Sequence, residues 1–104
     1  MKISNTETIA NQTINETLGI ARGSTVRSRN IGRDIFASLK NIVGGEIEEY
    51  TKLQADAREQ ALKRMISDAQ RLGADAVVNV RFTTSVVAQG ASEMLAYGTA
   101  VKLK

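Results

Sequence analysis

Four arginines gather in one short segment, at Arg22, Arg27, Arg29 and Arg33. Guanidinium groups form paired hydrogen bonds with phosphate and carboxylate oxygens, so such a cluster can bind a phosphate or a nucleic acid. A helix that begins near Asn30 would add its N-terminal N–H groups to the site. No aromatic residue lies among the arginines for base stacking, however, and arginine is also common in protein interfaces. The segment predicts a phosphate site, or a charged face that pairs with solvent or another subunit.

A second candidate site lies on a predicted strand over residues 75–83, where Asn79 and Arg81 share one face with Val77 and Thr83. The other face of this strand is apolar and consists of Ala76, Val78, Val80 and Phe82. If the face of Arg81 lines the inside of an oligomer, several copies converge on the axis and require a counter-ion. The alternative is that Arg81 pairs with an acid such as Glu93 and fixes the strand register.

The chain contains no histidine and no cysteine. The side chain that titrates near neutral pH and the soft thiolate nucleophile are therefore both absent. Ser24, Thr25 and Ser38 have no base to activate them, so nucleophilic catalysis is not expected. Three glutamates within residues 46–49 precede or begin a predicted helix, where negative charge stabilises the helix dipole rather than catalysing hydrolysis. We expect no catalytic residue, no metal ligand and no cofactor.

Size and composition favour self-association. The 104 residues form a single predicted domain, 1–104, with 42% hydrophobic but only 4% aromatic residues. A small aliphatic core without disulfides gives marginal stability, which contacts between copies can supplement. The net charge of +3 is mild and its charges are interleaved, which does not favour a dedicated nucleic-acid binder. No signal peptide and no membrane span are expected, so the predicted location is cytoplasmic.

Hydrophobic periodicity predicts the order strand, strand, helix, helix, strand, strand, which is an α+β fold. The expected ranges are strands at 2–5 and 13–26, helices at 31–43 and 47–72, a strand at 75–83, a hairpin loop within 84–93 and a strand at 94–103. Gly19 and Gly23 are expected bulge or turn points in the second strand, with a break at Gly23–Ser24.

The long predicted helix and the last strand have matching small-residue faces. The helix stripe includes Ala57, Ala61, Met65 and Ala69, and one strand face carries Ala96, Gly98 and Ala100. A flat face of this kind allows a helix or another backbone to approach closely. Gly44–Gly45 and Gly73 are expected to end the two helices.

Several segments of the chain resemble the bacterial YbjQ-like family. They are Gly23–Val26, Asn30–Leu39, Ile42–Gly45, Leu72–Val80 and Tyr97–Val101, and the resemblance covers essentially the whole sequence. The resemblance implies a pentamer whose strands combine into a β-barrel, with the long helix outside. It implies no established biochemical activity, and the family carries a heavy-metal-binding label. Soft metals prefer thiolate or imidazole ligands, so that label is poorly supported in a chain without cysteine or histidine.

The resemblance also implies a subunit contact around Gly32, where glycine weakens a helix by about 1 kcal/mol but permits close backbone approach. Arg33 and Asp34 would lie in the same interface. The resulting hypothesis is a non-enzymatic homo-oligomeric binding or scaffold protein, with a small ligand or ion at the subunit interface or on the barrel axis near Asn79 and Arg81. The alternative is phosphate or nucleic-acid binding through the segment Arg22–Arg33.

Overall fold

The computed structural model describes residues 1–27, 48–88 and 91–104 of the chain. Within these ranges the chain forms one long helix and a mixed sheet of four strands, so the predicted α+β class is confirmed. The elements are β1 (Lys2–Ile3), β2 (Ile14–Arg27), α2 (Glu48–Arg71), β3 (Ala76–Ala88) and β4 (Ala91–Leu103). The predicted helix at 31–43 and the glycine pair Gly44–Gly45 lie outside the described residues.

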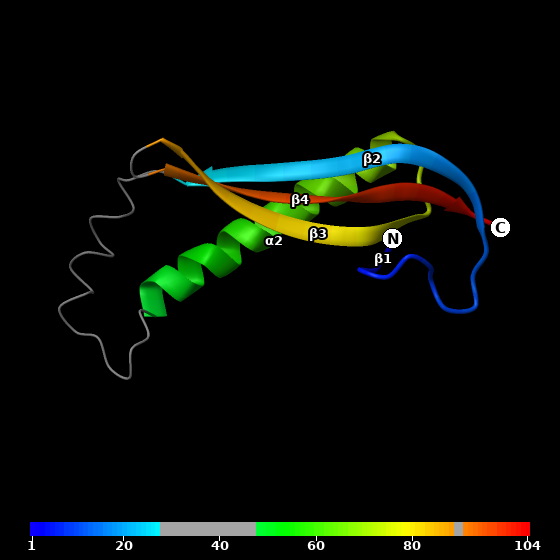
Figure 1. Cartoon of the computed structure of the whole chain (residues 1–104), viewed down its shortest axis with the longest axis horizontal. Coiled ribbons are helices and arrows are strands. Elements are labelled where there is room, and N and C mark those ends of the chain that lie inside the picture. Colours follow the sequence, from blue (N-terminus) through cyan, green and yellow to red (C-terminus); the bar gives the residue numbers. More distant parts are fainter. Residues whose placement is uncertain (28–47, 89–90) are drawn as a thin grey trace.

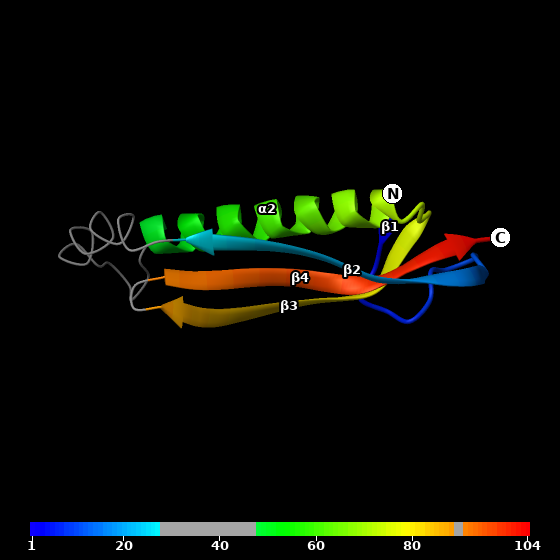
Figure 2. The ribbon, with the colours of Figure 1, turned by 90° about the horizontal axis from the view of Figure 1, so that it is seen from above.

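The sheet has the strand order β1-β3-β4-β2, with β1 parallel to β3 and the other neighbours antiparallel. Figure 1 shows α2 crossing one face of the three long strands. In the view of Figure 2 the helix runs beside β2, and its contacts are mainly with β2 and β4. The fold is therefore a two-layer arrangement in which β2 lies closest to the helix and β3 furthest from it.

Small side chains let the helix and sheet backbones approach each other closely. The predicted stripe of Ala57, Ala61, Met65 and Ala69 is buried, and the sheet contributes Ala21, Ala96 and Ala100 to the same core. At Gly23 an added Cβ would collide with the backbone of α2 at Met65 and Ala61. Close contact of this kind gains dispersion energy over many atom pairs, which compensates for the small apolar area of each alanine.

The C-terminus of α2 is closed by a Schellman motif. Gly73 has φ +80° and donates its N–H to the Gln70 carbonyl at 3.0 Å, while Ala74 donates to the Ala69 carbonyl at 3.0 Å. A left-handed residue at this position favours glycine because it has no Cβ. The prediction that Gly73 ends the helix is confirmed.

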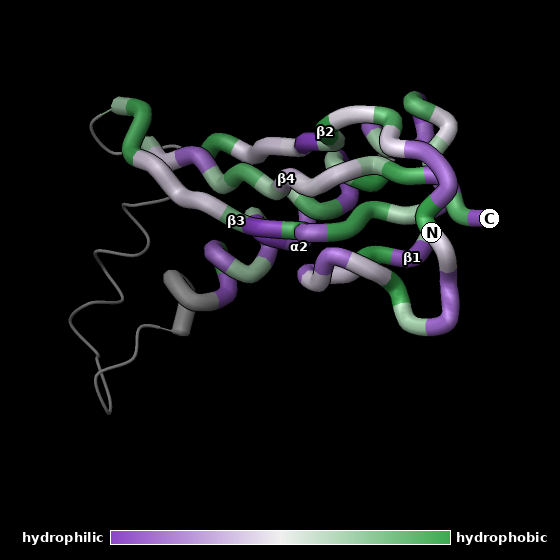
Figure 3. Tube along the Cα trace, turned by 45° about the vertical axis from the view of Figure 1, so that its right-hand side comes forward, coloured by the Kyte–Doolittle hydropathy of each residue, from purple (hydrophilic) through white to green (hydrophobic). Residues whose placement is uncertain are grey.

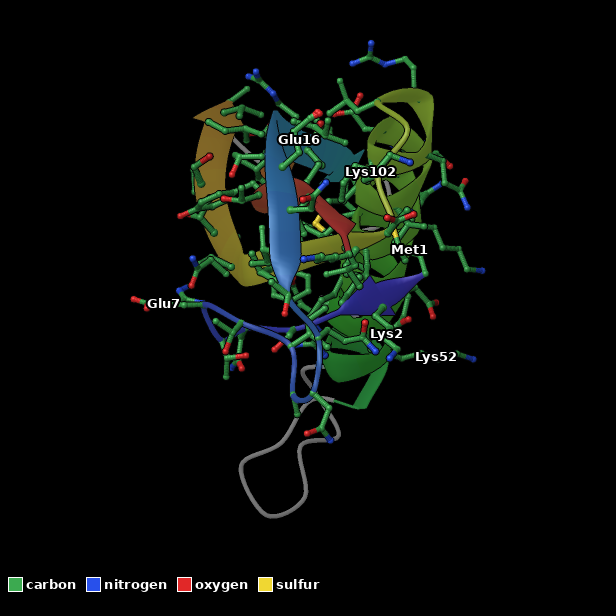
Figure 4. All side chains as sticks on the ribbon, turned by 90° about the vertical axis from the view of Figure 1, so that its right-hand side faces the viewer. Met1, Lys2, Glu7, Glu16, Lys52 and Lys102 are labelled. Atoms are coloured by element: carbon green, nitrogen blue, oxygen red, sulfur yellow. The ribbon has the colours of Figure 1, made fainter. Side chains whose placement is uncertain are left out.

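The described residues cover the sheet face opposite α2 at only one end. There Ala76, Val78 and Val101 form a second small core with Ile9 and Ile14. Further along, Ile20, Val26 and Tyr97 lie on the same face with exposures of 62%, 56% and 38%. The far end of β3 is also hydrophobic in Figure 3, where Val86 and Val87 are exposed. Seen end-on in Figure 4, α2 lies against one side of the curved sheet, and the side chains of Glu7 and Lys52 point away from both layers.

Two sequence predictions about the strands are wrong. The predicted strand ends on either side of the hairpin loop within 84–93 are wrong: β3 continues past residue 83 to Ala88 and β4 begins at Ala91 rather than 94, because the Thr- and Val-rich residues 83–87 have high β-propensity. The predicted break at Gly23–Ser24 does not occur, since β2 pairs with β4 without interruption from Gly19 to Arg27. Glycine is required at position 23 because the backbone of α2 leaves no room for a Cβ there. Gly19, with φ +135°, does lie at a bulge as predicted.

Candidate functional site

A pocket of about 510 Å³ lies where the short strand β1 ends beside β3. Its lining residues come from the N-terminal segment, the middle of β3 and α2: Ile3, Ser4, Asn5, Leu62, Val80, Arg81 and Phe82. The segment after β1 is held in place because Ser4 donates to the Val77 carbonyl and accepts, through its own carbonyl, from Val80 N–H, both at 3.0 Å. Three elements that are distant in the sequence therefore meet at one pocket, which is lined by both polar and apolar residues.

Among the described residues that line this pocket, Arg81 is the one with a charged side chain. Its Nη1 donates to the backbone carbonyls of Asn5, at 2.8 Å, and Val80, at 3.0 Å. Among the described residues it makes no ion pair, so the alternative of a pair with Glu93 is not observed there. The guanidinium of this exposed residue is thus held by neutral backbone oxygens and has no charged partner in the described part of the chain.

A β-bulge in β3 determines which side chains reach the pocket. Val78 pairs with Thr99 and Arg81 pairs with Tyr97, so Asn79 and Val80 together oppose Gly98. Asn79 adopts the left-handed conformation with φ 54° and donates its N–H to the Thr6 carbonyl at 2.9 Å. Asparagine tolerates this conformation better than most residues, and bulges often redirect side chains beside functional sites.

The bulge also corrects the predicted faces of this strand. Val77 packs in the core under α2 together with Val80, whereas Val78 packs in the core on the opposite face. Arg81 therefore does not share a face with Val77, as simple alternation predicted, because the extra residue at the bulge reverses the order of the faces. An asparagine between two valines was the signal in the sequence, since asparagine is rare in regular strands.

The structure does not join the described arginines of the segment Arg22–Arg33 into one site. Arg22 is exposed opposite Tyr97, whereas Arg27 is half-buried and its Nη2 donates to Gln60 Oε1 at 3.1 Å. Alternation along β2 places these two side chains on opposite faces of the sheet. Arg29, Gly32, Arg33 and Asp34 lie outside the described residues, so the interface predicted for them stays a prediction.

Polar side chains of α2 cover the free edge of β2. Asp68 Oδ2 accepts from Arg22 N–H at 3.0 Å, and Arg64 Nη1 donates to the Ser24 carbonyl at 2.6 Å. The Arg22 N–H bond, followed by the Arg71 side chain, holds the pKa of Asp68 below its ordinary value of 3.8. These contacts between α2 and β2 were not predicted from the sequence, although the spacing of Arg64 and Asp68 by four residues places them on one side of the helix.

The residues do not fit a soft-metal centre. The whole sequence has no histidine or cysteine, and the described part holds no group of three potential metal ligands among His, Cys, Asp and Glu. Two carboxylates are already engaged: Asp68 as described, and Asp75 with the Leu103 N–H at 2.9 Å and Lys102 at 3.8 Å. No helix in the described ranges is long and apolar enough to cross a membrane.

In its described residues the chain has a small α+β fold in which one helix packs on a mixed sheet. A protein of unknown function from Pediococcus pentosaceus, assigned to the DUF74 family, has a similar crystal structure with a TM-score of 0.65 and 16% identity. That likeness covers 100% of this chain and 98% of the other and concerns the fold alone.

Sequence relatives identify the family. The YbjQ family model, described as "Putative heavy-metal-binding", matches residues 1–104. Proteins named UPF0145 are 59% identical in Halorubrum lacusprofundi over 104 residues, covering 100% of both chains, and 61% identical in Archaeoglobus fulgidus over 102 residues, covering 98% and 94%. A UPF0145 protein of Photobacterium profundum is 59% identical over 98 residues, covering 94% of this chain and 95% of its own. The chain therefore belongs to the YbjQ (UPF0145) family, and its archaeal relatives correct the expectation of a bacterial family.

Proposed function

We propose that this chain is a non-enzymatic binding or scaffold protein that works as a closed homo-oligomer, with five copies forming a ring. The number five comes from the family resemblance. The observation that carries self-assembly is the contrast, within the described residues, between the two long edges of the sheet: β2 is bonded to α2, whereas β3 is open. Unpaired edges are sites where another strand can add, and a closed ring removes them.

The open edge is the outer side of β3. From Arg81 to Ala88 this strand is exposed, and β1 pairs with it only at Ala76 and Val77. The Val80 N–H points outwards to the Ser4 carbonyl, so strand alternation directs the N–H groups of Phe82, Thr84 and Val86 to the same side. No strand within the described ranges pairs with those groups, so an extended segment of a second copy could bind there.

The exposed apolar residues support a second copy as the occupant. Ile20, Val26 and Tyr97 on the sheet face, and Val86 and Val87 at the end of β3, are all more than a third exposed. Small monomeric domains gain much of their stability by burying such residues. Association of identical chains would bury the edge and this face together, and it would supplement a core built largely of alanine.

Native mass spectrometry of the untagged protein, purified without chelator, tests the assembly. We expect a five-fold species, either bare or with additional mass from a retained ligand. A monomer at micromolar concentration would contradict the proposal and would redirect attention to the arginine segment 22–33. Mixed oligonucleotides should bind weakly or not at all; tight binding that falls steeply with salt would favour the nucleic-acid alternative.

A proline at the open edge tests the route of assembly. Thr84→Pro removes an outward N–H without touching the bonds between β3 and β4, and proline is tolerated at strand edges. We expect this variant to keep its circular dichroism spectrum but to lose the oligomer. Thr84→Val is the matched control, because it keeps the N–H and loses only the hydroxyl contact with the Met94 sulfur at 3.2 Å. An oligomer that survives in Thr84→Pro would exclude this edge as the interface.

A further inference from the structure

We propose that the pocket at Arg81 binds a small carboxylate ligand with an apolar body. This inference rests on the proposed binding role of the assembly and specifies its ligand class. Three observations on different parts of the pocket carry it: the free donors of Arg81, the apolar walls and the position of the pocket at the start of the open edge.

The hydrogen bonds of Arg81 leave one particular edge of its guanidinium free. A guanidinium has five N–H donors, and the two on Nη1 are used by the carbonyls of Asn5 and Val80. Nε and Nη2 donate to no described residue, and neither is a buried atom without a partner. These two nitrogens form the parallel pair of donors that fits the two oxygens of one carboxylate. The anchored Nη1 restricts the side chain before a ligand binds, which reduces the entropy lost on binding.

The walls of the pocket favour an apolar body attached to the carboxylate. Ile3, Leu62, Val80 and Phe82 contribute apolar surface from three different elements. A cavity of about 510 Å³ is within the range of small-molecule sites, which combine apolar walls with a few polar groups that fix orientation. Inorganic phosphate, by contrast, would use the charge of Arg81 but would leave these walls without a partner.

The pocket lies where paired and unpaired parts of β3 meet. Segment 4–6 follows the strand as far as the bulge, and the open edge begins at Arg81 and Phe82. A second copy that binds along this edge would therefore border the mouth of the pocket. In the assembled protein this arrangement would increase the enclosure of the ligand.

Saturation-transfer NMR of the purified, assembled protein tests the site with hexanoate as the probe. We expect hexanoate to bind, its neutral analogue hexanamide to bind at least tenfold more weakly, and acetate to bind more weakly by about fourfold for each buried methylene it lacks. Arg81→Gln should weaken hexanoate binding by between about 10-fold and 100-fold, because a charge-assisted paired hydrogen bond is lost. Arg22→Gln is the matched control, since it removes an exposed arginine from the same sheet but outside the pocket, and it should leave binding unchanged.

Four other results would overturn either the ligand inference or the proposed oligomer. Equal binding of hexanoate and hexanamide would remove the role of the charge, and this comparison uses the wild-type protein, so it does not depend on the folding of a variant. Phosphate that displaces hexanoate at equal concentration would show a general anion site. A monomeric Arg81→Gln would show that Arg81 holds the assembly together. A wild-type monomer that still binds hexanoate would instead refute the proposed oligomer and leave the pocket assignment intact.

Discussion

The contact between Gly23 and α2 gives the most direct test of how the helix and sheet are joined. A Cβ added at Gly23 would lie 2.6 Å from the backbone carbon of Arg64 and closer still to Met65 N and Ala61 O, whereas ordinary contact begins at 3.4 Å. All three atoms belong to the helix backbone, so no side chain can rotate away. Gly23→Ala therefore requires α2 to move away from β2 by about an ångström or more.

Two effects set the size of the expected loss. Overpacking a tight core costs about 1–3 kcal/mol. The same movement lengthens the bonds from Arg64 to the Ser24 carbonyl and from Arg22 N–H to Asp68, now 2.6 and 3.0 Å, and each such bond contributes about 1 kcal/mol. We expect a total loss of about 3 kcal/mol or more, which is a large part of the 5–15 kcal/mol typical of small domains.

Urea unfolding followed by circular dichroism measures this loss, at one fixed protein concentration because association couples stability to concentration. In thermal unfolding the midpoint should fall by more than about 10 °C. Gly73→Ala is the control, because φ +80° strains alanine there but no atom lies within 4 Å of the new Cβ. That variant should lose only about 1 kcal/mol. A Gly23→Ala protein no less stable than Gly73→Ala would refute the close contact of β2 and α2.

Four further variants probe the bulge, the β4 contact and the covered edge. Asn79→Gly should leave the free energy of unfolding within a few tenths of a kcal/mol, whereas Asn79→Val should lose about 1–2 kcal/mol in urea, because a branched residue resists φ 54°; equal stabilities would contradict the bulge. Gly98→Ala should lose about 1–3 kcal/mol, since its Cβ would lie 2.6 Å from Val77 Cγ1, and an unchanged urea midpoint would contradict that contact. Because the pKa of Asp68 is lower in the folded protein than its ordinary value of 3.8, its ionised carboxylate stabilises the fold. This contribution is fully present at pH values above 3.8 and disappears as the pH falls through the folded-state pKa. The stability advantage of wild type over Asp68→Asn should therefore be constant above that range and shrink below it; an advantage that does not change with pH would count against the Asp68 contacts.

Much of the fold was predictable because its long elements have simple periodicity. The stripe of Ala57, Ala61, Met65 and Ala69 predicted α2 to within a residue at each end, and alternation predicted most of β4. Strand faces beyond Asn79 were not predictable by counting, because one additional residue in a bulge reverses every later side chain. The role of Gly23 was also hidden, since a glycine that permits contact with a distant helix looks the same in the sequence as one that permits a turn.

The candidate site was predictable only in part. Arg81 stood out as a charge within an apolar strand, and the structure places it in a pocket. Ser4 and Asn5 gave no signal, because their position depends on a parallel pairing with residues more than 70 positions away. Leu62 and Phe82 resembled ordinary core residues, and only the end of β1 explains why they border a cavity instead. A pocket that forms because two distant segments pair, or because a neighbouring strand ends, leaves little trace in a single sequence.

Helix α2 forms hydrogen bonds with one edge strand of the sheet, β2, but makes few contacts with β3 at the other side. This difference links the fold to the proposed assembly. Arg64 and Asp68 bind a carbonyl and an N–H of β2, which satisfies backbone groups that would otherwise recruit another strand. The helix makes few contacts with β3 and satisfies none of the outward groups from Phe82 to Val86 by any bond within the described ranges. A ring requires two different, complementary surfaces on each copy, so in the proposed ring the open edge of β3 meets a different segment of the next copy rather than the same edge. The proposed assembly surface and the proposed ligand pocket therefore lie along the same edge strand, β3.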